Sequence, residues 1–154
     1  MFPLSVYKNY LDLLYKKLSG YKNIADVLSS KDKWTIRNNV SHLIDSASNN
    51  HQRFVRLQLN EKVTLPGYEA ESWCSVSGIK DMPYVDLVEL WKLYNVYLLE
   101  IISNIKAESL NHVWINEADG KSYTLDFLVK DYFEHMKLHE KMIDDIAYSI
   151  LGEK

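Results

Sequence analysis

Four long segments of this chain carry apolar residues at alternating steps of three and four, and this period constrains the fold more than any other feature. The stripe of the first segment consists of Leu4, Tyr7, Leu11, Leu14 and Leu18. Residues with this spacing lie on one side of an α-helix, and that side must be covered by other apolar surfaces. The pattern therefore predicts a first helix from about residue 3 to the stop signal at Ser19-Gly20.

Three further helices are predicted from the same period and its flanking residues. Thr35 is a suitable N-cap for a second helix that extends to about Leu59. Pro83 suits the first turn of a third helix, and Thr124 caps a fourth that runs to about Leu151. The stripe of the third helix consists of Leu87, Leu90, Trp91, Tyr94, Leu98, Ile101, Ile102 and Ile105. The segment "EADGKSYT", which precedes the fourth helix, predicts a turn or hairpin-like loop.

The connection between the second and third helices decides the topology. Residues 60–82 contain Pro66, Gly67 and Gly78 and lack a clear period, so we expect a long crossover. Roughly twenty residues reach ~60 Å when extended, which is enough to return along a bundle and make the second and third helices parallel. The sequence thus predicts an all-α fold without convincing strands. We expect an up-down-down-up four-helix bundle in a single domain that covers residues 1–154.

The composition argues against several classes of partner. Apolar residues make up 47% of the chain and charged residues 25%, which is typical of a soluble globular protein. The net charge of -3, with both signs interspersed, lacks the basic face of a nucleic-acid-binding protein. The apolar runs are too short for a membrane span, and the lysine-containing N-terminal segment lacks the apolar region of a signal peptide. We therefore expect neither a nucleic-acid partner nor a membrane partner, and the sequence leaves a homodimer open.

Cys74 is the one cysteine of the chain and cannot form an internal disulfide. A reducing, cytoplasmic location is therefore expected. No basic residue adjoins Cys74 in "SWCSVSG", so a passive thiol is favoured over a reactive one.

His135 and His139 are four residues apart in "DYFEHMKLHEK", so they lie one above the other on the fourth helix. The apolar arc of that helix consists of Leu125, Leu128, Val129, Tyr132, Met136, Ile143, Ile146 and Ile150. Both histidines fall within this arc and should face the bundle interior. Two stacked, inward imidazoles need two sets of partners, and a shared metal ion supplies both. Two packed core histidines are the alternative.

A third metal ligand would have to come from His42 or His51 on the second helix. These residues are nine apart, about half a turn out of phase, so only one of them can face the site. The apolar arc lies closer to His51, whereas His42 belongs to a polar stripe with Ser46, Asn49 and Arg53. That stripe either faces solvent or forms one wall of a polar pocket beside a metal. Periodicity alone leaves this choice open.

The segments "KWTIRNNVSHLIDSASNNHQRF" and "LDFLVKDYFEHMKLHEKMI" resemble the DinB-like superfamily, the DNA-damage-inducible and YfiT-like metal-binding four-helix bundles. The shared pattern is a tryptophan, then His-Leu-x-Asp on the second helix, then H-x-x-x-H on the fourth. The resemblance covers essentially the whole chain. It implies a divalent metal, zinc or nickel, held by His42, His135 and His139, and it does not extend to His51.

The same resemblance implies a small-molecule substrate and two kinds of activity. Characterised members of the superfamily include transferases that use low-molecular-weight thiols, and many others are described as metal-dependent hydrolases. Three neutral imidazoles leave coordination positions open for water or a thiol, as in a catalytic zinc site. A metal there would lower the pKa of either nucleophile toward neutrality. A metal-binding bundle without catalysis, serving stress response or partner binding, is the alternative.

No general base is evident beside the histidines. An H-E-x-x-H motif would place a glutamate after the first histidine, but this chain has Met136 there. Asp45 and Asp131 each lie one turn from a predicted ligand and are candidates to orient it. Arg53 is a candidate to hold an anionic substrate group, because its helical phase places it beside His42 and Asn49. An ordinary surface role is the alternative for each of these residues.

Overall fold

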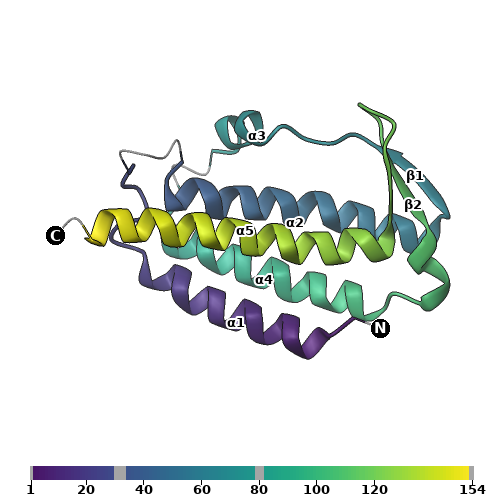
Figure 1. Ribbon diagram of the computed structural model, residues 1–154, viewed down its shortest axis with the longest axis horizontal. Coiled ribbons are helices and arrows are strands. Elements are labelled where there is room, and N and C mark those ends of the chain that lie inside the picture. The colour runs from purple at the N-terminus through teal and green to yellow at the C-terminus, as the bar shows by residue number, and fades with distance from the viewer. Residues whose placement is uncertain (1, 30–33, 79–81, 153–154) are drawn as a thin grey trace.

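The computed structural model describes residues 2–29, 34–78 and 82–152, and its frame is a bundle of four long helices (Figure 1). These are α1 (Leu4–Gly20), α2 (Ile36–Leu59), α4 (Tyr84–Ser103) and α5 (Leu125–Gly152). The helix starts that the sequence predicts are confirmed to within a residue. Two short elements follow long helices along the chain: α3 (Ala70–Val76) comes between α2 and α4, and the 3-10 helix η2 (Ala107–Asn111) comes between α4 and α5.

The paired contacts give the direction of each helix. Arg37, near the start of α2, donates to the carbonyl of Met82, just before α4, and His51, farther along α2, contacts Tyr94 of α4. Because residue numbers increase in the same direction along both helices, α2 and α4 run parallel. Asn39 meets His139, whereas Phe54 meets Tyr132, so α2 and α5 are antiparallel.

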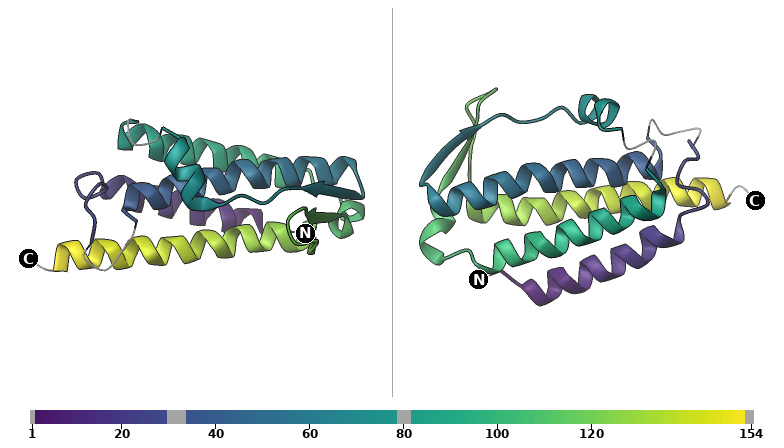
Figure 2. Two further views of the ribbon diagram at one scale, coloured as in Figure 1. Left: turned by 90° about the horizontal axis from the view of Figure 1, so that it is seen from above. Right: turned by 180° about the vertical axis from the view of Figure 1, so that it is seen from behind.

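Further contacts place α1 in the same scheme. Tyr7 stacks on Phe133 and Lys17 pairs with Asp144, which makes α1 parallel to α5. Figure 1 shows the result: α1 and α5 run one way and α2 and α4 the other. The view from behind in Figure 2 shows the same directions.

A three-stranded sheet closes one end of the bundle, and here the expectation of an all-α chain without strands was wrong. The strands are β1 (Lys62–Leu65), β2 (Val113–Asn116) and β3 (Ser122–Thr124). They lie in the order β1-β2-β3, with β1 parallel and β3 antiparallel to β2. Strands of three or four residues are too short to produce a clear two-residue period.

The hairpin-like loop predicted from "EADGKSYT" is confirmed as the β2–β3 turn. The Gly120 amide donates to the Asn116 carbonyl at 2.8 Å, and Gly120 has a φ of +69°. Glycine suits this left-handed conformation because it has no Cβ to clash. The turn leads directly into α5, where Thr124 Oγ1 accepts from the Phe127 amide, as expected of an N-cap.

The crossover contains β1 and α3 and is more ordered than its lack of period suggests, although residues 79–81 of the predicted crossover lie outside the described residues. Seen from above, it runs lengthwise along the bundle, over the boundary between α2 and α5 (Figure 2, left). Within it, the rings of Tyr68 and Trp73 contact each other, with centroids 5.0 Å apart. Residues 66–78 are called the strap below.

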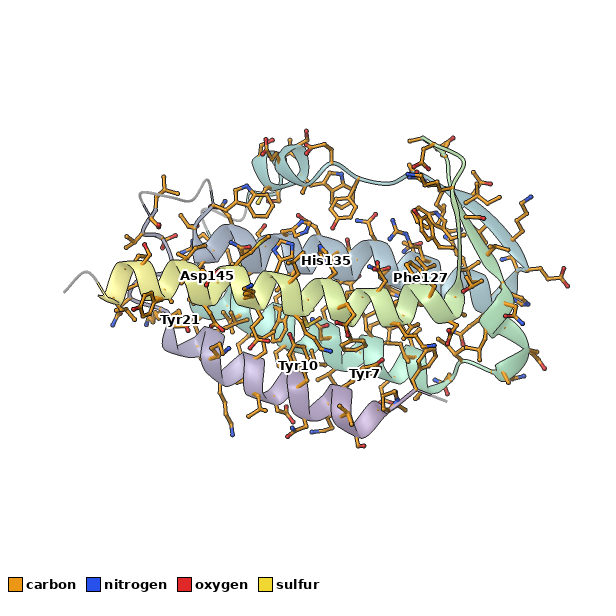
Figure 3. All side chains as sticks on the ribbon, viewed as in Figure 1. Tyr7, Tyr10, Tyr21, Phe127, His135 and Asp145 are labelled. Atoms are coloured by element: carbon orange, nitrogen blue, oxygen red, sulfur yellow. The ribbon has the colours of Figure 1, made fainter. Side chains whose placement is uncertain are left out.

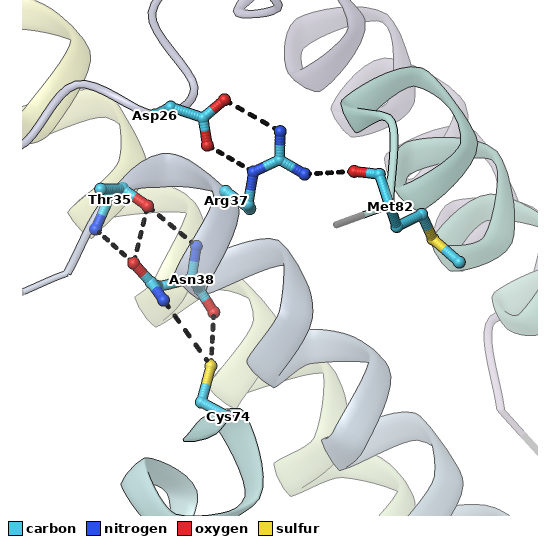
Figure 4. A network of polar contacts seen from close by, with 6 residues as sticks. All are labelled: Asp26, Thr35, Arg37, Asn38, Cys74 and Met82. Atoms are coloured by element: carbon cyan, nitrogen blue, oxygen red, sulfur yellow. Dashed lines mark hydrogen bonds and ion pairs between the residues drawn. The ribbon is translucent and has the colours of Figure 1, made fainter. Parts of the chain in front are cut away.

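The first turn of α2 is fixed by a group of polar contacts (Figure 4). Thr35 and Asn38 form a capping box, in which each side chain accepts a hydrogen bond from the other's backbone amide. The Arg37 guanidinium pairs with Asp26 and donates to the carbonyl of Met82. Cys74 of α3 lies against Asn38. These contacts hold in place the turn that leads to His42.

The long helices meet in a continuous apolar core. Its largest fully buried side chains include Phe54, Trp91 and Phe133. At its edge, Lys17 of α1 makes ion pairs with Glu140 and Asp144 of α5. None of the helices within the described ranges is both long enough and apolar enough to cross a membrane.

Candidate metal centre

Three histidines converge between α2 and α5. One ring nitrogen each of His42, His135 and His139 lies within 4.8 Å of the other two. His42 Nε2 and His135 Nε2 are 3.2 Å apart, and the ring of His139 lies 4.5 Å from that of His42 and 4.6 Å from that of His135. Figure 3 shows His135 on the side of α5 that faces α2, below the strap.

The orientation of His139 is set by Asn39, one turn before His42. The Asn39 Nδ2 group donates to the carbonyl of Thr35, so its Oδ1 atom is directed at His139 Nδ1, 2.9 Å away. An amide oxygen can only accept, so His139 Nδ1 carries the proton and its Nε2 keeps a free lone pair. This is the arrangement in which a second residue prepares a histidine to bind a metal.

All three imidazoles are in the neutral form at neutral pH. Burial, with a further contribution from the neighbouring histidines, lowers the pKa of His42 to about 4 and that of His139 to about 3. Burial also lowers the pKa of His135, although the charge of Asp131 opposes it. Neutral imidazoles offer the lone pairs that a divalent cation needs, whereas protonated ones would repel it.

The donor set fits a divalent ion. Zinc–nitrogen bonds of about 2.0–2.1 Å place two ligands of a tetrahedral site about 3.3 Å apart, close to the 3.2 Å between His42 and His135. Without an ion, those two nitrogens can share only one proton, and His42 Nδ1 is a buried atom without a hydrogen-bond partner among the described residues. The cluster therefore lacks the hydrogen bonds expected of three ordinary core histidines.

Tyr68 lies next to His42, and Asp45 follows His42 by three residues on α2 and acts on Tyr68 through its charge. Asp45 is buried, and its Oδ2 atom has no hydrogen-bond partner within the described chain. Burial raises the pKa of Asp45 to about 6. The ring of Tyr68, on the strap, lies 5.8 Å from that of His42, and burial, together with the charge of Asp45, raises the pKa of Tyr68 to about 12. At neutral pH the site thus has a carboxylate that accepts a proton and a phenol that keeps its own.

The sequence also suggested residues that could orient a metal ligand or hold a substrate, and the structure gives the contacts of each. Asn49 donates to the carbonyl of Asp45 in its own helix. Asp131 is exposed and acts on His135 through its charge. Asp45, expected to orient His42, leaves His42 Nδ1 without a partner in the described chain. Arg53 is partly buried and lies over the ring of Trp114, with Cζ 3.9 Å from the ring centroid.

His51 and Cys74 lie apart from the three-histidine cluster. His51 Nδ1 is 3.1 Å from the hydroxyl of Tyr94, so this imidazole is directed toward α4. Cys74 Sγ lies 3.5 Å from Ser41 Oγ and packs α3 against α2.

Three residues beside the site were not assigned a role from the sequence. Asn39 shares the polar stripe of His42, three residues earlier, so helical phase was the signal that could have found it. Trp34 belongs to the quoted motif, and its ring lies 5.3 Å from that of His42 and 6.2 Å from that of His139. Tyr68 lies in the aperiodic strap, where the sequence carries no comparable signal.

Comparison with solved structures gives a match over almost the entire chain. A protein described as "YfiT from Bacillus subtilis is a probable metal-dependent hydrolase with an unusual four-helix bundle topology" superposes with a TM-score of 0.82 at 17% identity. The match covers 96% of this chain and 87% of that one. The fold is that of YfiT. The resemblance to YfiT-like bundles indicated by the sequence motifs is thereby confirmed at the level of the fold. No family model and no curated protein matches the chain.

Proposed function

We propose that this protein binds a divalent metal, zinc or nickel, through His42, His135 and His139. The observation that carries the proposal is the convergence of three neutral imidazoles, one of them oriented by Asn39. The description of YfiT as a probable metal-dependent hydrolase supports it. When bound, the metal would supply Lewis acidity that makes a water molecule or a small thiol nucleophilic at neutral pH.

We propose further that the site is catalytic and acts on a small molecule, by hydrolysis or by transfer of a low-molecular-weight thiol. Asp45 Oδ2 is the proton acceptor in this scheme, because its pKa of about 6 leaves it ionised yet basic at neutral pH. The Tyr68 hydroxyl, which keeps its proton, donates a hydrogen bond to the substrate. The strap limits the access of water, since its Tyr68 ring lies beside that of His42.

A direct test is elemental analysis of protein purified without a histidine tag, together with thermal melting. We expect one metal ion per chain in the wild type and none in His135→Ala. A metal at 100 times its dissociation constant stabilises the folded state by about 2.7 kcal/mol. For a chain of this size that corresponds to about 5–10 °C in melting temperature.

The control is His51→Ala, which should keep both the metal and the melting response, because His51 faces Tyr94. A chelator should lower the melting temperature of the wild type and of His51→Ala but not of His135→Ala. If His135→Ala retains stoichiometric metal, or loses the same stability with and without metal, the three-histidine site is wrong.

Activity is tested on the metal-loaded protein with thiol-transfer and ester-hydrolysis substrates. Asp45→Asn should retain the metal but lose at least tenfold in kcat/KM, and wild-type kcat/KM should fall as pH decreases through about 6. A fully metal-loaded protein without turnover on either substrate class would favour the non-catalytic alternative.

A further inference from the structure

Arg53 is a partly buried cation without a carboxylate partner in the described part of the chain. Among the described residues, no acidic oxygen lies within 4 Å of its guanidinium. Its Nη1 atom donates to Asn50 Oδ1 at 3.3 Å, and burial lowers the pKa of the group while the charge of Asp131 opposes this effect. A buried charge is costly unless it is paired, so an arginine in this state is suited to receive an anion.

The guanidinium is held in one place by the sheet. Its Cζ atom lies 3.9 Å from the ring centroid of Trp114, and Trp114 Nε1 donates to the carbonyl of Leu65, which ties the indole of β2 to β1. An arginine stacked on an aromatic ring keeps its planar edge free for hydrogen bonds. Because its position is already fixed, an anion would bind there with little loss of side-chain entropy.

Arg53 lies on the same side of α2 as His42. The eleven steps from His42 to Arg53 turn the helix by about three full turns and 20°, over a rise of about 16 Å. The contact with Asn50, eight residues beyond His42, brings the guanidinium to a level about 12 Å along the axis from that histidine. Tyr68 connects the two positions, because its ring contacts His42 and its hydroxyl interacts electrostatically with Arg53.

We infer that Arg53 binds the carboxylate end of an elongated small substrate whose reacting end lies at the three histidines. The inference rests on the proposed function and specifies its substrate class. A carboxylate suits this site better than a phosphate dianion, since one guanidinium balances one negative charge. The nearby charge of Asp131 also disfavours a second negative charge.

Calorimetric titration of the zinc-loaded full chain with two matched pairs of probes tests the inference. The long pair is 8-mercaptooctanoate and 8-mercaptooctanol, and the short pair is 3-mercaptopropanoate and 3-mercaptopropanol. A hydrogen-bonded ion pair corresponds to roughly a tenfold or greater gain in affinity, so the long acid should bind at least about tenfold more tightly than the long alcohol. The short acid should show no such preference, because it cannot span the distance.

Arg53→Met keeps the apolar contact with Trp114 and removes the charge, so it should abolish the preference of the long pair for the acid. Arg56→Met is the matched control, since Arg56 is exposed on the same helix and its guanidinium donates to Gln52. Arg53→Lys, which keeps the charge without the planar fork, should retain a reduced preference. Equal affinities of long acid and alcohol in the wild type, or a preference that persists in Arg53→Met, would overturn the inference.

The zinc content of every variant is measured in parallel. A wild type that binds neither zinc nor nickel contradicts the proposed function and still permits the Arg53 test through hexanoate and 1-hexanol, which carry no thiol. In that arm, a preference for hexanoate that Arg53→Met removes supports the anion site, and equal binding of the two probes contradicts it.

Discussion

At the scale of single residues, Asn39 determines which nitrogen of His139 can bind a metal, because its oxygen accepts the Nδ1 proton. Asn39→Ala removes this acceptor and leaves a buried N–H group unpaired. Loss of such a supporting residue typically costs 10–100-fold in metal affinity. We therefore expect weaker zinc binding by roughly that factor, measured by competition with a chromophoric chelator.

Asn49→Ala is the matched control for this substitution. The Asn49 amide donates to the carbonyl of Asp45 in its own helix, so its removal should change zinc affinity by less than about threefold. Similar losses in both variants would mean that Asn39 acts only through the general stability of α2.

Asp45 gives the site a pH dependence of stability with a defined sign. Its pKa is raised from 3.8 to about 6 by burial, so the folded state holds this proton more tightly than the unfolded chain. The stability contributed by the proton is complete below about pH 4 and is lost as pH rises through about 6. Asp45→Asn should therefore be more stable than the wild type at pH 8, by about 1–2 kcal/mol, and equally stable at pH 4.

Urea unfolding at both pH values, with chelator present, measures this difference. A gain that is the same at pH 4 and pH 8 would show that the carboxylate charge is not its cause. The same substitution should reduce catalysis, so Asp45 is a position where activity and stability oppose each other.

How much of the site the sequence predicts depends on where each residue lies. His42, His135 and His139 are on long helices, where a fixed rotation per residue and a known motif indicate a shared side. The sequence did not show whether the polar stripe of α2 is buried. Helical phase gives the side of the helix on which a residue lies, but not what covers that side. Tyr68 covers this stripe from a segment without any period, so only the folded chain reveals it.

At the scale of elements, the capping box is the contact that starts α2 one turn before Asn39. Thr35→Ala removes the acceptor for the Asn38 amide, which should cost about 1 kcal/mol of stability. Thr35→Ser keeps the hydroxyl and should lose only a few tenths of that. Chemical denaturation of the two variants provides the comparison, and equal losses would indicate that the methyl group, not the cap, stabilises this turn.

The helices were predictable as elements and the strands were not, for a physical reason. The long helices have 17 to 28 residues, so each has several turns over which an apolar stripe and the capping residues can be recognised in the sequence. The pairing of Val63 with Trp114 joins positions fifty residues apart, and nothing local in either four-residue strand specifies that partner.

At the scale of the whole molecule, the core contributes stability according to burial and not according to residue type. Leu57 and Leu59 lie two positions apart near the end of α2, with exposed fractions of 0% and 78%. Leu57→Ala should cost 2–5 kcal/mol, as large-to-small core substitutions do, while Leu59→Ala should remain within about 0.5 kcal/mol. Urea midpoints measure both, and a large loss in Leu59→Ala would reveal a contact that covers this end of the helix in solution.

The strap has a consequence for engineering. The three histidines and Asn39 lie on α2 and α5, which pack directly against each other, whereas the strap only passes over them. The metal ligands thus lie on elements separate from the strap, which contributes Tyr68 beside His42. A library that varies the strap side chains while leaving the two helices unchanged would alter the substrate contacts made by the strap and keep the three-histidine site constant.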